Sequence, residues 1–429
     1  MMVSAALLQR CRRPSALVRC MQASATTVTA DVSNFRTLRE SNLTYVDKTG
    51  EIDDLLSFDR SFVLCRPPRF GKTVMLTLLK ELFEGNRQLF DGTVGPRLAI
   101  ADAPWDWDDE QHTVLHFDLK HLANAKSFRA NLFAAMDAKA TALGRKLPET
   151  TSLKSKTRDL IQAAADHSPS QQCVVLVDNY DSPLRVNDLA ISDTEDEILP
   201  MNHRVVDDWL DGIRAEQACV RFQMFVGVYK VESTAVSIAN DISLATQCST
   251  LCGYTRQDIE TAFPLELDHL VALNQASSRD TLLDRIGAWY GGYSWGQTAA
   301  SDRIHNPFSV NRLMMESAFE PYWSQETAVS PSLVHMLHDV DLRDMLSSLF
   351  VLPEVFNNEL PKFTSKRDVL TDRLRMKLLQ LGLLTVEETE YTVQTLQRVA
   401  RLGVPNKDVE QILRIPPVVA EKSQAGIHP

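Results

Sequence analysis

The sequence predicts an α/β fold, with a parallel sheet covered by helices on both faces and a mostly helical C-terminal domain after it. Two observations predict the sheet. Short apolar segments alternate with segments of helical pattern up to residue 228. These apolar segments are nearly continuous, which is typical of strands buried on both faces. After about residue 255 the strand signals fade, and helical patterns dominate to about residue 385.

Four apolar segments have the length and composition of buried strands. They are residues 61–65, 112–118, 172–177 and 221–228. Directly after the first of them, residues 74–83 carry apolar side chains at helical spacing. The sequence therefore predicts a strand, a turn and a helix in immediate succession there.

Helical patterns account for much of the remaining N-terminal half. A short one ends near Leu56, and residues 126–166 have helical composition with a break around Gly144 and Pro148. Glycine and proline interrupt helices, so we expect the helical structure to be broken at that point. Residues 188–200 are acidic and polar, and they predict a loop or an insertion.

Composition excludes some classes of protein. The 429 residues carry a net charge of −11, which argues against broad, non-specific binding of nucleic acid but leaves a local basic face open. No segment approaches the roughly 20 apolar residues of a membrane span, so we expect no membrane partner. The seven cysteines are irregularly spaced and indicate reduced thiols in an intracellular compartment.

Residues 1–32 differ in composition from the rest. They contain several arginines, serines and threonines and no acidic residue before Asp31. This composition is typical of a mitochondrial presequence. An over-extended gene start is the alternative, because Met21 is a second candidate for initiation. Both interpretations stay open, as does a disordered leader in a cytoplasmic protein.

Residues 66–73 form the turn between the first strand and its helix, and they read Arg-Pro-Pro-Arg-Phe-Gly-Lys-Thr. The ending Gly-Lys-Thr in a strand–loop–helix context predicts a phosphate-binding P-loop, or Walker A motif. Arg66 stands where the usual pattern has glycine, and two prolines reduce the number of backbone donors. A turn that merely contains Gly-Lys-Thr is the structural alternative.

Each residue type in the loop has an expected task. Backbone N–H groups at the helix start would bind phosphate, Lys72 would neutralise the β- and γ-phosphates, and Thr73 would place its hydroxyl on Mg²⁺. Arg66 and Arg69 would compensate with charge for the missing amides. The predicted ATP contacts are Arg66, Arg69, Phe70, Gly71, Lys72 and Thr73.

Asp178 closes the apolar strand that begins near residue 172. An aspartate at a strand end is what P-loop enzymes use to hold Mg²⁺, directly or through water. The predicted metal ligands are therefore Thr73 and Asp178, the latter as the Walker B residue. A helix cap or a turn residue is the alternative reading of Asp178.

The ordered set of motifs resembles the AAA-ATPase-like family, whose members carry an Arg-Pro-Arg-Arg-Phe-Gly-Lys-Ser loop. The resemblance covers roughly residues 33–410 and includes later matches as well as the loop. These are Tyr45–Thr49, Leu82–Gly85, Asp178–Leu184, Asn240–Ser243, Cys252–Thr255, Trp289–Tyr293, Asn306–Ser309, Leu379–Thr385 and Val404–Asn406. The resemblance implies a P-loop NTPase fold that binds ATP with Mg²⁺.

The resemblance also identifies a departure. Family members have glutamate, the expected general base, after the strand-end aspartate, and here that position is Asn179. An amide cannot accept the proton, and loss of a base typically lowers the rate about 10²–10⁴-fold. Asp181 is a candidate substitute. We expect an ATP-binding protein with weak ATPase activity, and the alternative is a pseudo-ATPase that acts as a nucleotide-gated or structural scaffold.

The resemblance divides the chain into four parts. Residues 1–32 are the leader, 33–265 the P-loop domain, 266–400 a helical subdomain, and 401–429 a tail that we expect to be partly disordered. Many relatives continue into a PD-(D/E)xK nuclease domain, which we do not expect in the twenty or so residues left here. A homo-oligomer or a protein partner is the implied assembly.

Overall fold

The computed structural model of the chain describes residues 26–107, 111–123, 127–184, 195–230, 239–295, 303–326, 342–351, 366–391 and 398–413. Two sequence predictions fall largely outside these ranges. Residues 1–25 of the expected leader and residues 414–429 of the expected tail are not among the described residues.

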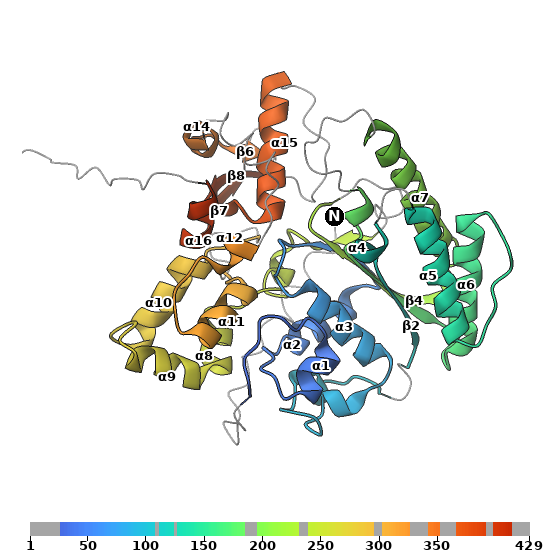
Figure 1. Cartoon of the computed structure of the whole chain (residues 1–429), viewed down its shortest axis with the longest axis horizontal. Coiled ribbons are helices and arrows are strands. Elements are labelled where there is room, and N and C mark those ends of the chain that lie inside the picture. Colours follow the sequence, from blue (N-terminus) through green and yellow to red (C-terminus); the bar gives the residue numbers. More distant parts are fainter. Residues whose placement is uncertain are drawn as a thin grey trace, which may run out of the picture.

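A five-stranded parallel sheet forms the centre of the fold (Figure 1). Its strands are β1 (Ser61–Cys65), β2 (Thr113–Asp118), β3 (Cys173–Asp178), β4 (Val220–Gly227) and β5 (Asn240–Asp241), in the spatial order β2-β3-β4-β1-β5. All the pairings are parallel. Every residue of β3 is buried, as the continuous apolar segment predicts. The predicted fold class is confirmed. Within this sheet, the two-residue strand β5 is the one strand that the sequence did not predict.

Helices cover both faces of this sheet. In Figure 1, α1 (Phe35–Glu40), α2 (Thr49–Phe58) and α3 (Lys72–Phe83) gather on one side, and α5 (Phe128–Ala142), α6 (Leu153–His167) and α7 (Glu195–Ala215) on the other. The short helix α4 (Leu119–Leu122) follows β2 directly. The break predicted near Gly144 falls between α5 and α6. The loop predicted over residues 188–200 is wrong from Glu195 onward, because α7 begins there.

The C-terminal part is mostly helical, as predicted. Its helices are α8 (Arg256–Ala262), α9 (Pro264–Ala272), α10 (Arg279–Tyr290), α11 (Pro307–Glu316), α12 (Tyr322–Glu326), α14 (Leu342–Ser347), α15 (Lys366–Leu381) and α16 (Lys407–Leu413). Helices α8–α11 pack around a core of their own that includes Phe263, Leu282 and Leu313.

A second, antiparallel sheet in this part was not predicted. Its strands are β6 (Phe350–Val351), β7 (Thr385–Tyr391) and β8 (Arg398–Gly403), in the order β6-β8-β7. β7 lies at the edge of the sheet, carries three glutamates, and shifts register between Val386 and Glu388. Charged residues and an irregular register are common in edge strands, and they conceal the alternation by which a strand is recognised.

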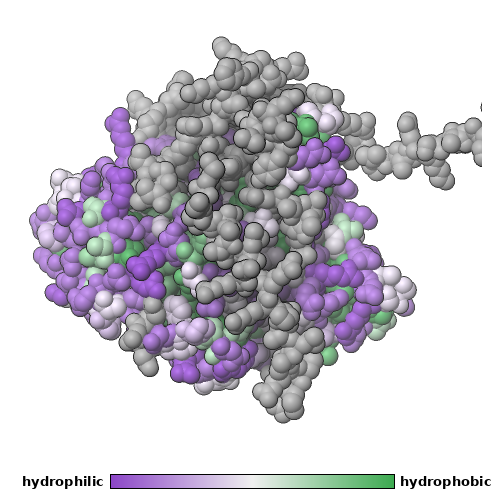
Figure 2. All heavy atoms as spheres, turned by 180° about the vertical axis from the view of Figure 1, so that it is seen from behind, coloured by the Kyte–Doolittle hydropathy of each residue, from purple (hydrophilic) through white to green (hydrophobic). Residues whose placement is uncertain are grey.

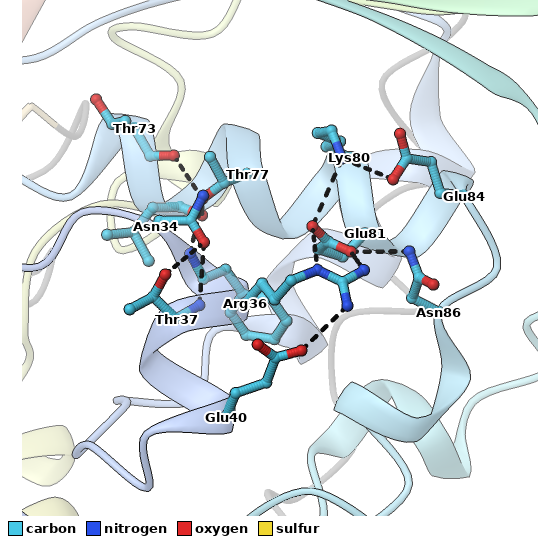
Figure 3. Close-up of polar contacts among 12 residues, drawn as sticks. Asn34, Arg36, Thr37, Glu40, Thr73, Thr77, Lys80, Glu81, Glu84 and Asn86 are labelled. Carbon is cyan, nitrogen blue, oxygen red and sulfur yellow. Dashed lines mark hydrogen bonds and ion pairs between the residues drawn. The ribbon is translucent and has the colours of Figure 1, made fainter.

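Helix α1 fixes helix α3, which follows the predicted P-loop (Figure 3). Thr77 Oγ1 accepts from the Phe35 amide over 3.0 Å and donates to the Thr73 carbonyl over 3.0 Å. Arg36 Nε donates to the buried Glu81 carboxylate over 3.2 Å. Breaking a buried charged pair is costly because the remaining charge loses its partner, so these contacts hold α3 in one orientation.

Seen from behind, the described surface is mostly hydrophilic, and hydrophobic residues show in small groups (Figure 2). Within the described ranges, no helix is both long enough and apolar enough to cross a bilayer.

Candidate functional site

The turn of residues 66–71 connects β1 to the N-terminus of α3. Gly71 is the N-cap residue and has a φ of 86°, and a Cβ added there would meet no atom within 4 Å. Glycine is therefore needed for the backbone angle and not for space. No side chain caps α3 at Gly71, so the first N–H groups of this 12-residue helix can donate to an anion.

A cavity of about 700 Å³ opens at this end of α3. Residues 68–75 form one wall, and Asp118 and Asn179, which stand at the ends of β2 and β3, line another part. The N-terminal segment between Thr29 and Lys48, residues 251–254, the start of α11 at Pro307 and Glu326 also line it. Cavities of this size hold small-molecule ligands, and several segments distant in sequence contribute to this one.

The Lys72 side chain lies along the inside of the turn. Its Nζ donates to the carbonyl oxygens of Arg66 and Pro67 over 2.9 and 2.8 Å. The ammonium group is nearly buried and belongs to a residue that lines the cavity. These contacts hold a positive charge at the place where the sequence predicts the phosphates.

Thr73 and Asp178, the two predicted metal ligands, lie in direct contact. Thr73 Oγ1 donates to Asp178 Oδ2 over 2.6 Å. Asp178 Oδ1 is buried and has no hydrogen-bond partner within the described part of the chain. Burial raises the pKa of Asp178, and the hydrogen bond from Thr73 and the charge of Lys72 oppose this increase.

The donor set suits Mg²⁺. Magnesium prefers oxygen ligands and is commonly held by one or two protein groups plus phosphate and water. A threonine hydroxyl and a carboxylate with an orphaned, buried oxygen match that preference. Within the described residues there is no cluster of three or more His, Cys, Asp or Glu side chains that would make an all-protein metal cage.

Arg66 does not point into the cavity, and the predicted phosphate contact by its side chain is wrong. The residue is fully buried, and its guanidinium donates to the carbonyl oxygens of Cys65, Ser243 and Cys248 at 2.9, 2.7 and 3.1 Å. It also lies 4.5 Å from the centre of the Trp295 ring. Burial lowers the pKa of Arg66. The arginine thus holds the turn to the core beneath it.

The side chains of Phe70 and Arg69, two further predicted ATP contacts, lie in different surroundings. The Phe70 ring is fully buried and packs edge-on against Tyr293 at 4.8 Å, so only its backbone can face a ligand. Arg69 lines the cavity, has a φ of 66°, and places its guanidinium 4.8 Å from the Phe308 ring centre and 3.5 Å from Glu326. Of the two arginines in the turn, Arg69 is the one at the cavity.

Asn179 lies at the cavity beside an acidic residue that the sequence analysis did not single out. Asn179 Nδ2 donates to Asp118 Oδ1 over 3.0 Å, and both residues line the cavity. Asp118 ends β2 and pairs in register with Asp178, at the end of β3. A strand-ending aspartate on a neighbouring parallel strand was the available signal, because such residues meet at one sheet edge.

Asp181, the predicted substitute for the missing glutamate, points elsewhere. It is fully buried, and its Oδ2 accepts from the amides of Val228 and Tyr229 at 3.2 and 3.0 Å. It does not line the cavity. These contacts tie the end of β3 to the end of β4, so the residue has a structural task.

Comparisons with known proteins give a family match for part of the chain. Residues 30–237 match the family model described as Predicted AAA-ATPase. The chain is 31% identical over 313 residues to an uncharacterized protein from the vnfD 5′ region of Azotobacter chroococcum mcd 1. That match covers 71% of this chain and 55% of the relative, so the chain spans about half the relative's length.

A search of solved structures gives a weak likeness. The structure described as Drosophila ORC bound to DNA shares 11% identity, with 94% of this chain and 96% of that chain covered and a TM-score of 0.28. A TM-score this low carries no argument about fold or function.

Proposed function

This chain, through residues 30–237, belongs to the AAA-ATPase-like family, and on that premise we propose that it binds ATP with Mg²⁺ and hydrolyses ATP slowly. The observation that carries the proposal is the 2.6 Å hydrogen bond from Thr73 to Asp178 at the N-terminus of α3. This pairing joins a hydroxyl that lines the cavity, at a helix N-terminus, to a buried carboxylate directly behind it.

The phosphates would bind at the turn. The amides that follow Gly71 carry the positive end of the helix dipole, and anions are favoured there. Lys72 Nζ would give up one of its hydrogen bonds to a backbone carbonyl and donate to a phosphate oxygen instead. Arg69 would add a positive charge from the cavity side. Pro67 and Pro68 supply no amide, so these two side chains take a larger share than in a glycine-rich loop.

Thr73 and Asp178 would hold the metal. When bound, Mg²⁺ draws charge from the phosphate oxygens and orients them. Asp178 Oδ1 would gain the partner that it lacks in the structure. The raised pKa of Asp178 would fall in the complex, because a neighbouring cation favours the ionised form.

Slow hydrolysis follows from Asn179. The amide can accept a hydrogen bond from water but not its proton, and the buried Asp181 is held by backbone amides. Turnover about 10²–10⁴-fold below that of an enzyme with a well-placed base is the expected consequence.

Equilibrium binding of a fluorescent ATP analogue tests the proposal. Lys72→Ala should weaken binding at least tenfold in the presence of Mg²⁺. Lys80→Ala is the matched control, since Lys80 lies on the same helix, pairs with Glu84 at 2.6 Å and does not line the cavity. Equal binding by wild type and Lys72→Ala, or no binding by wild type, contradicts the proposal.

A scaffold without catalysis is the second candidate, and the amide at Asn179 favours it. Such a protein would bind the analogue as tightly as the proposed ATPase but release no phosphate. Phosphate release by wild type under single-turnover conditions, with protein in excess, separates the two. A rate above that of the Thr73→Ala, Asp178→Ala double variant removes the scaffold.

A further inference from the structure

The carboxylate of Asp118 lies at the cavity and is hydrogen-bonded to Asn179, the residue that replaces the expected base. Asp118 stands opposite Asp178 in the β2–β3 pairing, and its charge contributes to the raised pKa of Asp178. Among the described residues, the acidic side chains that line the cavity are Asp118 and Glu326. Asp118 is thus one strand away from the predicted metal ligand and open to the cavity.

The two oxygens of Asp118 have different surroundings. Oδ1 accepts from Asn179 Nδ2 at 3.0 Å and from the Lys120 amide at 3.0 Å, as the N-cap of α4. Oδ2 lies 3.3 Å from Nε2 of the exposed His121. The bonds to Oδ1 fix the carboxylate in place, and the Asp118 side chain as a whole remains about 31% exposed.

Glu326 is the competing carboxylate, and its setting is less suitable. It lies at the end of α12, half-exposed, and faces Arg69 across 3.5 Å. Its carboxylate is thus already paired with a side chain that is expected to bind phosphate. Asp118, in contrast, is bonded to the residue that stands in the place of the family's glutamate.

We infer that Asp118, held by Asn179, is the general base for ATP hydrolysis in this chain, an inference that rests on the proposed function. The water oxygen forms a bond to the γ-phosphorus, and the bond from that phosphorus to the β,γ-bridging oxygen breaks. Asp118 takes the proton from the water, and the electron pair of the broken bond stays on ADP. The side-chain oxygen Oδ1 of Asn179 accepts a hydrogen bond from the remaining O–H of the water and so orients the water.

Asp118→Asn is a matched test, because asparagine keeps the size, the N-cap of α4 and an acceptor for Asn179 while it removes the basic group. We expect single-turnover phosphate release to fall at least about 10²-fold, with the dissociation constant of the ATP analogue changed less than threefold. Asp91→Asn is the control, because this partly buried aspartate accepts from the Thr93 amide at 3.0 Å and does not line the cavity.

A rescue variant separates the catalytic role from a structural one. Asn179 has a φ of 53°, a region that aspartate tolerates about as well as asparagine. Combining Asp118→Asn with Asn179→Asp moves the carboxylate across the same hydrogen bond. At least a tenfold recovery of turnover over Asp118→Asn is expected, and a purely structural Asp118 would give none.

Five results overturn the inference. Unchanged turnover in Asp118→Asn is one, and loss of ATP binding by that variant is another, because it makes Asp118 a binding residue. Loss of turnover in Glu326→Gln but not in Asp118→Asn assigns the base to Glu326. If wild type binds ATP without hydrolysing it, the inference about Asp118 is contradicted but the proposed ATP binding is not. If wild type does not bind ATP, both the inference and the proposed function are contradicted.

Discussion

Asp178 carries a charge that the fold of the free protein disfavours. Burial raises its pKa above the ordinary value of 3.8, so the folded protein binds a proton there more readily than the unfolded chain. The contribution to stability therefore falls as pH rises from about 3.8 through the raised pKa. Above that window the ionised carboxylate destabilises the free protein.

Asp178→Asn should consequently raise the unfolding midpoint of the nucleotide-free protein at pH 7. The amide keeps an acceptor for Thr73 and carries no charge. The difference from wild type should shrink as pH falls through the raised pKa, since wild-type Asp178 then becomes protonated. Thermal unfolding between pH 4 and pH 8 measures both effects, and an equal midpoint at pH 7 would contradict the burial argument.

The residues of the site differ in how far sequence alone places them. Lys72, Thr73 and Asp178 are predictable, because the strand–turn–helix pattern and the strand-end aspartate fix where they meet. Arg66 is not, since only the tertiary structure shows three carbonyl oxygens beneath the turn. Asp118 lies 61 residues from its partner Asn179, and strand order decides that they touch.

At the scale of elements, Asp408 on α16 anchors the starts of two other helices. Its carboxylate accepts from the Ser309 hydroxyl at 3.2 Å on α11, and from the Trp323 and Ser324 amides at 3.0 and 3.1 Å on α12. Trp323 Nε1 then donates to the Pro68 carbonyl of the turn over 3.1 Å. A helix near the end of the described chain thereby supports the turn of residues 66–71.

Asp408→Ala should lower the free energy of unfolding by about 3 kcal/mol, because it leaves several buried donors without an acceptor, each costing ~1–3 kcal/mol. Asp408→Asn should cost less, since the amide retains one acceptor oxygen. Denaturant unfolding compares both with Glu410→Ala, an exposed position on the same helix. Asp408→Ala as stable as the Glu410 control would show that the anchor is dispensable.

The strands of the two sheets were not equally predictable. β3 and β4 are apolar and buried along almost their whole length, which the sequence displays directly. β7 is polar and pairs through an irregular register, so its pattern resembles that of an exposed helix. Helical propensity of glutamate favours the wrong assignment there, and tertiary pairing overrides it.

For the whole molecule, one ligand would bridge parts that are distant in sequence. The cavity is lined by residues from Thr29 to Glu326, so unfolding of either part would release the nucleotide. ATP with Mg²⁺ at 100 times its dissociation constant should raise the free energy of unfolding by about 2.7 kcal/mol. Calorimetry should show one shifted transition; a shift confined to one of two transitions would contradict this coupling.

The assembly of the whole molecule is where sequence reasoning is weakest. A parallel sheet with helices on both faces follows from local patterns, and the structure confirms it. The packing of α11 and α12 against the turn depends on contacts such as that of Arg69 with the Phe308 ring. No local sequence pattern predicts these contacts. A homo-oligomer or a protein partner, and import into mitochondria, stay predictions.

The burial of Arg66 limits which residues can replace it in the turn of residues 66–71. Its planar group serves three carbonyl oxygens spread over two chain segments and also stacks on Trp295. A lysine has the same charge but neither the fork nor the flat face. Arg66→Lys should therefore lower the stability of the fold. Arg69→Lys should leave the stability almost unchanged, because Arg69 lies at the solvent side of the turn. The same substitution, usually regarded as conservative, would thus have different effects at the two arginines.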